Sequence, residues 1–140
     1  MSASGTTKFA VLGTGCIGCC VGITLALSLY DVAFVGRKSE KFAKIEASRS
    51  LTLTFPEKDN TKVLQSENIT SDEKHGLTGR NVVFVATKRT ANANAAKAIA
   101  AYSPQGALVV LLQNGLDASK EVLEVFKSQG REDLIVFDCE

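Results

Sequence analysis

Along the chain, short runs of apolar residues alternate with segments in which apolar positions recur at the spacing of a helix. The runs, each typical of a strand that is buried on both faces, are residues 9–12, 32–35, 82–86, 108–112 and 134–137. The segments that predict helices are residues 17–29, 39–45, 91–102 and 118–128. Strands that alternate with helices predict a mostly parallel sheet with helices on both faces, the doubly wound (Rossmann-type) α/β fold.

Two of these helices have a recognisable apolar face. In the first helix, one side is lined by apolar residues that recur every four positions, namely Ile17, Val21, Leu25 and Leu29. In the last helix, Val122, Val125 and Phe126 are expected to point inward. Ser39 is a suitable N-cap for the second helix, because its hydroxyl can accept a backbone N–H of the first turn.

The region between residues 51 and 70 interrupts this alternation. Residues 51–55 have the composition of a strand and precede a Pro-Glu-Lys-Asp-Asn turn, and residues 61–64 return as the partner strand. A further strand of the main sheet is expected near Ile69. The predicted fold therefore contains an inserted β-hairpin.

The composition is that of one globular domain over residues 1–140. The chain is 45% hydrophobic and 22% charged, with a formal net charge of +1, and its length suits one core rather than two. Binding of nucleic acid or of an anionic membrane needs a concentrated basic surface, whereas the basic residues here are scattered. We therefore expect neither as a partner.

Residues 9–30 contain no charged side chain, a length that would suffice for a membrane helix or the core of a signal peptide. Four glycines lie within this stretch, and each weakens a helix interior by about 1 kcal/mol relative to alanine. A strand, a glycine turn and a buried helix account for the same residues. We therefore expect neither a membrane helix nor a signal peptide in this stretch, and the cytoplasmic location that we expect follows from the cysteines.

The four cysteines do not form a recognisable framework. Cys16, Cys19 and Cys20 crowd into five positions, Cys139 lies near the end of the chain, and the only histidine is His75. Because a metal site needs a second pair of ligands, we expect no bound metal and reduced thiols. A helix N-terminus stabilises a thiolate, which leaves oxidation of Cys16 open.

A glycine-rich turn ends the first strand and begins the first helix, with the sequence Gly13-Thr14-Gly15-Cys16-Ile17-Gly18. Gly13 permits a tight exit from the strand, Gly15 lets a pyrophosphate approach the backbone, and Gly18 lets the helix pack close to the sheet. The N–H groups and the dipole at the start of the helix favour phosphate there. The motif lies within a strand–turn–helix–strand unit, so it predicts a dinucleotide-binding site.

The end of the second strand indicates which dinucleotide binds. Domains that prefer NAD usually place Asp or Glu there to bind the ribose 2′-hydroxyl, whereas this sequence has Arg37 and Lys38. A carboxylate would repel a 2′-phosphate, and Arg37 can bind one through charge-assisted hydrogen bonds. The sequence therefore favours NADP(H) over NAD; the alternative is that the pair forms a solvated turn.

Two polar residues follow later strands, at the edge where such sheets bind their ligands. Lys88 comes just after the strand that ends at Ala86, and Asn114 just after the strand that ends at Leu112. Both are placed to reach the nicotinamide end of a cofactor. On position alone, a surface lysine and an ordinary Asn-Gly turn are the simpler interpretation.

Taken together, these segments resemble the N-terminal domain of ketopantoate reductases (2-dehydropantoate 2-reductases). The matching segments are residues 11–18, 34–37, 83–88 and 111–116. The most specific are the strand that runs into Thr87-Lys88 and the one that runs into Gln113-Asn114-Gly115. The resemblance covers essentially the whole chain. Cys16 is a departure, because the family often has alanine at that position.

The resemblance implies hydride transfer from NADPH to the C2 ketone of a 2-keto acid, such as ketopantoate in pantothenate biosynthesis. Thr87, Lys88 and Asn114 would then line the cleft near the nicotinamide. Family members have a second, helical domain that supplies the general-acid lysine, and this chain of 140 residues lacks it. We therefore expect the chain to bind its cofactor with little or no turnover. The expected partner is a 2-keto acid, and a homodimer is a possible assembly.

Two other interpretations stay open on the sequence alone. A related opine-type or 2-hydroxy acid dehydrogenase would share the glycine turn and differ in its second domain. A non-catalytic NADP-binding module that senses redox state would use the same cofactor site without chemistry of its own.

Overall fold

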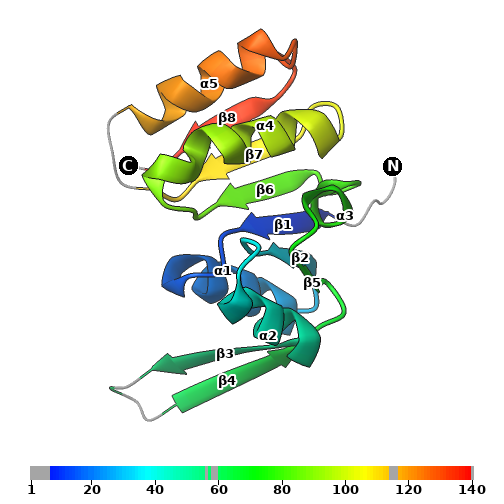
Figure 1. Cartoon of the computed structure of the whole chain (residues 1–140), viewed down its shortest axis with the longest axis vertical. Coiled ribbons are helices and arrows are strands. Elements are labelled where there is room, and N and C mark those ends of the chain that lie inside the picture. The colour runs from blue at the N-terminus through cyan, green and yellow to red at the C-terminus, as the bar shows by residue number, and fades with distance from the viewer. Residues whose placement is uncertain (1–6, 56, 58–59, 114–116, 140) are drawn as a thin grey trace.

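The computed structural model describes residues 7–55, 57, 60–113 and 117–139. Within these residues a six-stranded sheet has the order β5-β2-β1-β6-β7-β8, and a separate two-stranded sheet pairs β3 with β4 (Figure 1). The strands are β1 (Lys8–Leu12), β2 (Asp31–Val35), β3 (Ser50–Phe55), β4 (Asn60–Gln65), β5 (Ile69–Thr70), β6 (Val82–Val85), β7 (Leu108–Leu111) and β8 (Ile135–Asp138). The helices are α1 (Cys16–Leu27), α2 (Glu40–Ser48), α3 (Glu73–Leu77), the 3₁₀ helix η2 (Arg89–Ala91), α4 (Asn92–Tyr102) and α5 (Ala118–Ser128).

The order of the strands confirms the predicted doubly wound fold. The chain starts in the middle of the sheet at β1, moves outward through β2 to β5, and returns to β6 on the other side of β1. All neighbouring strands of this sheet run parallel. The strand order therefore reverses between β1 and β6, and ligands of such sheets bind at the carboxyl ends of the strands at this point.

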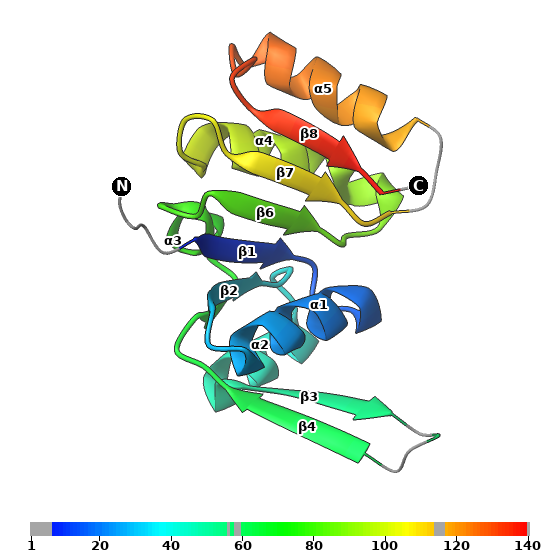
Figure 2. The ribbon, with the colours of Figure 1, turned by 180° about the vertical axis from the view of Figure 1, so that it is seen from behind.

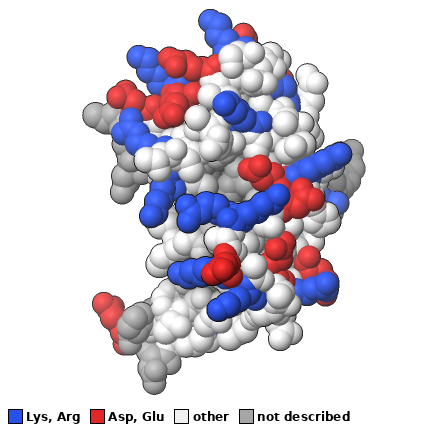
Figure 3. All heavy atoms as spheres, viewed as in Figure 1, with Lys and Arg blue, Asp and Glu red and all other residues white. Residues whose placement is uncertain are grey.

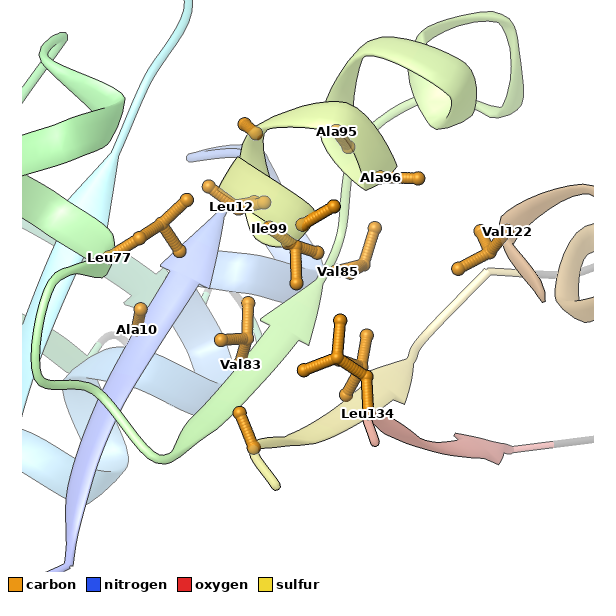
Figure 4. Close-up of a cluster of buried hydrophobic side chains, with 14 of the residues drawn as sticks. Ala10, Leu12, Leu77, Val83, Val85, Ala95, Ala96, Ile99, Val122 and Leu134 are labelled. Atoms are coloured by element: carbon orange, nitrogen blue, oxygen red, sulfur yellow. The ribbon is translucent and has the colours of Figure 1, made fainter. Parts of the chain in front are cut away.

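Helices cover both faces of the sheet, as predicted. Comparison of Figures 1 and 2 shows α4 and α5 on one face and α1 on the other. On the first face, Ala95 and Ile99 of α4 lie over Val83 and Val85 of β6 in one buried apolar cluster (Figure 4). The opposite face has its own buried cluster, built from β1, β2, α1, α2, β3 and β5.

The buried face of α1 differs from the one that its apolar spacing suggested. The buried residues of the helix are Gly18, Cys19, Gly22 and Ile23. Ile17 is 56% exposed, and Leu29, which lies beyond the end of the helix, is 94% exposed. A Cβ on Gly22 would stand 2.3 Å from a ring carbon of Phe34, so a small residue is required where the helix meets the sheet. The inward side of α1 therefore carries its glycines together with Cys19 and Ile23, and Ile17 does not belong to it.

The last strand is also less buried than its apolar composition predicted. Ile135 and Phe137 are each 58% exposed, and only Val136 packs partly against the core. Figure 2 shows no described helix in front of β7 and β8 on this face of the sheet. The prediction of strands covered on both faces is therefore wrong for β8, because no described helix covers the face to which Ile135 and Phe137 point.

The middle region follows the prediction closely. β3 pairs antiparallel with β4, so the inserted hairpin is confirmed. β5 extends the main sheet beside β2, as expected near Ile69. Ser39 caps α2 by accepting the N–H of Phe42 at 3.1 Å, and the helix continues to Ser48 rather than ending at Ile45. In the part of the chain that the structure describes, no helix has both the length and the apolar character needed to cross a membrane.

Candidate functional site

The glycine turn joins β1 to α1, and two of its glycines have no room for a side chain. Gly13 has a φ of +99°, and a Cβ there would lie 2.7 Å from the carbonyl oxygen of Ala86. A Cβ on Gly18 would lie 2.1 Å from the carbonyl oxygen of Gly13. Both positions need glycine, since the turn packs directly on the end of β6 and on the start of α1.

Gly15 faces open space instead. A Cβ on this residue would meet nothing within 4 Å. Gly15 is the N-cap of α1, no side chain caps the helix, and its first turn contains no acidic residue. The first N–H groups of a helix have no acceptor within the helix, so they are available to a ligand. An uncapped helix start beside open space is an arrangement that binds a phosphate group.

A cleft of about 820 Å³ opens at this end of the sheet. Its lining comes from the glycine turn, the segments that follow β2 and β6, part of α3 and one side of α4. The site residues predicted from the sequence that line it are Gly13, Thr14, Gly15, Arg37, Lys38, Thr87 and Lys88. The fold thus brings three separate sequence segments to one cavity, at the point where the strand order reverses.

The other predicted site residues have different positions. Cys16 and Ile17 are exposed at the start of α1, and Gly18 is buried beneath the turn. None of these three residues lines the cleft. Asn114 lies outside the described residues.

Arg37 and Lys38 supply positive charge to the cleft. Both are exposed, and neither forms a salt bridge with another described residue. Figure 3 shows Lys and Arg side chains in a row across the middle of the face that carries α3 and α4. The two charges are therefore available to an anionic ligand.

One wall of the cleft was not predicted from the sequence. It consists of residues from α3 and α4 and from the segments before them, namely Ser71, Glu73, Thr90, Ala91, Asn94, Ala95, Lys97, Ala98, Ala101 and Tyr102. The spacing of Ala91, Asn94, Ala98 and Ala101 places them along one side of α4. That pattern was visible in the sequence, but an alanine-rich side is equally typical of a helix packed on a core.

Cys19 supports the turn from below. Its Sγ donates to the carbonyl oxygen of Thr14 at 3.2 Å. Burial raises the pKa of the Cys19 thiol, and the neighbouring thiols of Cys16 and Cys20 raise it further. Cys19 is therefore a neutral donor beneath the turn.

The described residues contain no group of three or more side chains suited to hold a metal ion.

The model of the family described as ketopantoate reductase PanE/ApbA matches residues 9–137. No curated protein matches the sequence.

Solved structures share the fold along nearly the whole chain. A PanE/ApbA family ketopantoate reductase from Ralstonia eutropha JMP134 has a TM-score of 0.74 and 26% identity, over 93% of this chain and 40% of that one. Octopine dehydrogenase with NADH and L-arginine has a TM-score of 0.73 and 19% identity, over 94% of this chain and 34% of that one. NADP+-bound yersinopine dehydrogenase has a TM-score of 0.69 and 15% identity, over 95% of this chain and 34% of that one. The chain thus spans 34–40% of the length of these proteins.

Proposed function

Because this chain belongs to the ketopantoate reductase PanE/ApbA family, we propose that it is the NADPH-binding part of a 2-keto acid reductase, specifically a 2-dehydropantoate 2-reductase. The reaction would reduce ketopantoate to pantoate in pantothenate biosynthesis. The proposal includes a cytoplasmic location, a 2-keto acid as partner rather than nucleic acid or a membrane, and a homodimer as a possible assembly. The chain by itself would bind the cofactor with little turnover.

The observation that carries the proposal is the joining of two anion sites in one cleft. Gly15, which lines the cleft as the N-cap of the uncapped helix α1, forms one of them, suited to the pyrophosphate. Arg37 and Lys38 form the other, beyond the end of β2. Arg37 presents a planar set of donors that matches a phosphate group, so it is the residue proposed to bind the 2′-phosphate.

The choice of NADPH over NADH depends on this chain's own residues. Octopine dehydrogenase was solved with NADH and yersinopine dehydrogenase with NADP+, so both cofactors occur among similar folds. Here the segment after β2 is Gly36-Arg37-Lys38, without the carboxylate that would bind a ribose 2′-hydroxyl and repel a 2′-phosphate. The positive charges of Arg37 and Lys38 support NADP(H) as the cofactor.

Lys88 is the residue proposed to act nearest the reacting end of the cofactor. When bound, NADPH supplies the hydride. Lys88 lines the cleft just after β6, at the switch point of the sheet, and forms no salt bridge with a described residue. Its ammonium group would attract the anionic 2-keto acid and hold it beside the cofactor. Asn114 stays a prediction from the sequence, with the same positioning role.

An opine-type dehydrogenase is the second candidate. The octopine dehydrogenase structure has nearly the same TM-score as the ketopantoate reductase from Ralstonia eutropha JMP134. Such an enzyme would use the same cofactor cleft and differ in the substrate that meets it.

The cofactor assignment is tested by titrating the chain with NADPH and with NADH and following the nicotinamide fluorescence. Adenosine 2′,5′-bisphosphate and 5′-AMP then serve as competitors, because they differ only in the 2′-phosphate. We expect tighter binding of NADPH and strong displacement by the bisphosphate alone. Equal affinity for both cofactors would contradict the assignment.

The substrate assignment needs a separate experiment. NADPH oxidation is followed with ketopantoate, and in parallel with pyruvate plus L-arginine as the opine-type mixture, using a form that also contains a substrate domain. If NADPH is oxidised with ketopantoate but not with the mixture, the result supports a 2-dehydropantoate 2-reductase. If NADPH is oxidised only with the mixture, the result supports an opine-type dehydrogenase.

A further inference from the structure

Gln113, two residues beyond the end of β7, has a buried side chain at the edge of the sheet that carries the cleft. Its exposed fraction is 8%. The amide nitrogen Nε2 donates to both acceptors of Thr87, the backbone carbonyl oxygen and the hydroxyl Oγ1, the latter at 3.1 Å. Gln113 thereby ties the segment after β7 to the segment after β6.

The chemistry of Thr87 determines the orientation of this amide. A backbone carbonyl only accepts hydrogen bonds, so the amide nitrogen of Gln113, and not its oxygen, must face it. The amide oxygen has no hydrogen-bond partner among the described residues. Burial of an unpaired acceptor carries a desolvation cost that a hydrocarbon side chain of similar size would avoid. Packing alone therefore does not account for glutamine at this position.

Thr87 is held from its other side by the glycine turn. The peptide between Ala86 and Thr87 lies against Gly13, where an added Cβ would stand 2.9 Å from the Thr87 nitrogen. Gln113 binds the carbonyl of the next peptide, the one that joins Thr87 to Lys88. Thr87 is therefore held on its nitrogen side by the turn proposed to bind the pyrophosphate and on its carbonyl side by the buried amide of Gln113.

We propose that Gln113 is a positioning residue that sets the place of Lys88 relative to the bound cofactor. Lys88 follows Thr87 directly, begins η2 as its N-cap with an extended ψ of 148°, and lines the cleft. The direction of its side chain depends on the peptide that Gln113 holds. The contact between Lys88 and the cofactor rests on the proposed function, whereas the dependence of Lys88 on Gln113 does not.

The test compares Gln113→Leu and Gln113→Met with the control Gln129→Leu, whose side chain is exposed at the end of α5. Methionine is included because its unbranched side chain matches the shape of glutamine more closely than that of leucine does. One readout is the dissociation constant for NADPH. The other is the reactivity of Lys88 across pH, measured by competitive amine labelling and mass spectrometry, with the exposed Lys120 as internal reference. Thermal unfolding is followed in parallel.

Both Gln113 variants are expected to stay folded, to bind NADPH about tenfold more weakly, and to label Lys88 with an altered pH profile. Gln129→Leu should match the wild type in all three respects. Thr87→Val removes Oγ1, one of the two acceptors of Gln113, and should also bind NADPH more weakly. Adding Thr87→Val to Gln113→Leu should cause no further loss through this contact, because Gln113→Leu has already removed the hydrogen bond to Oγ1.

Wild-type NADPH affinity together with wild-type labelling of Lys88 in both Gln113 variants would overturn the proposal. A lower unfolding temperature without a change in either readout would also overturn it, since that is the result of a purely structural role. If the wild-type chain does not bind NADPH, the proposed function fails, and the labelling of Lys88 still decides the role of Gln113.

Discussion

Gly22 of α1 lies so close to the ring of Phe34 on β2 that an added Cβ would stand 2.3 Å from Cε1 and 2.9 Å from Cζ. Phe34 is fully buried, so an added Cβ would have to displace a ring of the core. We predict that Gly22→Ala lowers the free energy of unfolding by about 1–3 kcal/mol, the usual cost of overpacking a core. Chemical denaturation measures this change. Gly15→Ala is the matched control and should cost less, because an added Cβ there meets nothing within 4 Å.

Gly15→Val should separate binding from folding. The backbone of Gly15 is extended, with φ −76° and ψ −169°, a conformation that valine adopts readily. The new side chain would fill the open space in front of the start of α1. We expect a folded protein, judged by circular dichroism, whose melting temperature no longer rises when NADPH is added. Retained stabilisation by NADPH would place the nucleotide elsewhere.

Arg37→Ala should change the choice of cofactor rather than the fold. The side chain is exposed and forms no salt bridge with a described residue, so stability should not change. Loss of charge-assisted hydrogen bonds to a 2′-phosphate should weaken NADPH binding by about 10- to 100-fold and leave NADH binding as it was. Fluorescence titration with each cofactor measures both affinities. Arg89→Ala, an exposed arginine outside the cleft lining, is the control. An equal loss for both cofactors would argue against a 2′-phosphate contact.

The salt bridge between Arg131 and Asp133 should make the stability of the protein depend on pH. Arg131 Nε and Nη2 donate to the two carboxylate oxygens of Asp133 at 2.9 and 3.0 Å, and Asp133 also accepts the N–H of Gly106. The hydrogen bonds from Arg131 and then from Gly106 hold the pKa of Asp133 well below its ordinary value. A lowered pKa in the folded state stabilises the protein above the unfolded pKa of about 3.9, and this contribution is lost as pH falls toward the folded pKa.

Asp133→Asn should therefore be less stable than the wild type at neutral pH. Its stability should also fall less steeply below about pH 4, because the variant lacks the group whose protonation removes the contribution. Urea unfolding at a series of pH values measures both effects. Glu132→Gln changes an exposed neighbour outside the pair and serves as the control. Parallel curves for Asp133→Asn and the wild type would refute this linkage.

The cysteines should differ in their rate of alkylation. Cys16, Cys20 and Cys139 are exposed, whereas Cys19 is buried and its pKa is raised by that burial. Because the thiolate is the reactive form, we expect three thiols to react quickly with iodoacetamide and Cys19 to react slowly until the protein is unfolded in urea. Mass spectrometry of the labelled peptides identifies each site. Rapid labelling of Cys19 in the folded protein would show that the contact with Thr14 opens readily.

Local patterns in the sequence determined the strands, most helices and the part of the site that the glycine turn, Arg37 and Lys88 form. Buried parallel strands need continuous apolar runs, and such runs located β1, β2, β6 and β7 to within about one residue. The glycine turn was recognisable because Gly13 and Gly18 meet steric demands that no other residue satisfies. Arg37 and Lys88 were identified because the carboxyl ends of parallel strands lie at one edge of a sheet, and both line the cleft.

The tertiary structure alone decided which side of α1 faces the sheet, how far β8 is covered, and what holds Thr87. Helical spacing shows which residues share a side, but the approach of Phe34 requires the glycine side of α1 to face inward. β8 has the apolar composition of a buried strand, yet Ile135 and Phe137 are exposed because no described helix covers them. Gln113 reaches Thr87 across 26 residues of sequence, because β6 and β7 are neighbours in the sheet. Contacts between distant segments depend on strand order and side-chain shape together, so they leave no periodic mark in the sequence of either segment.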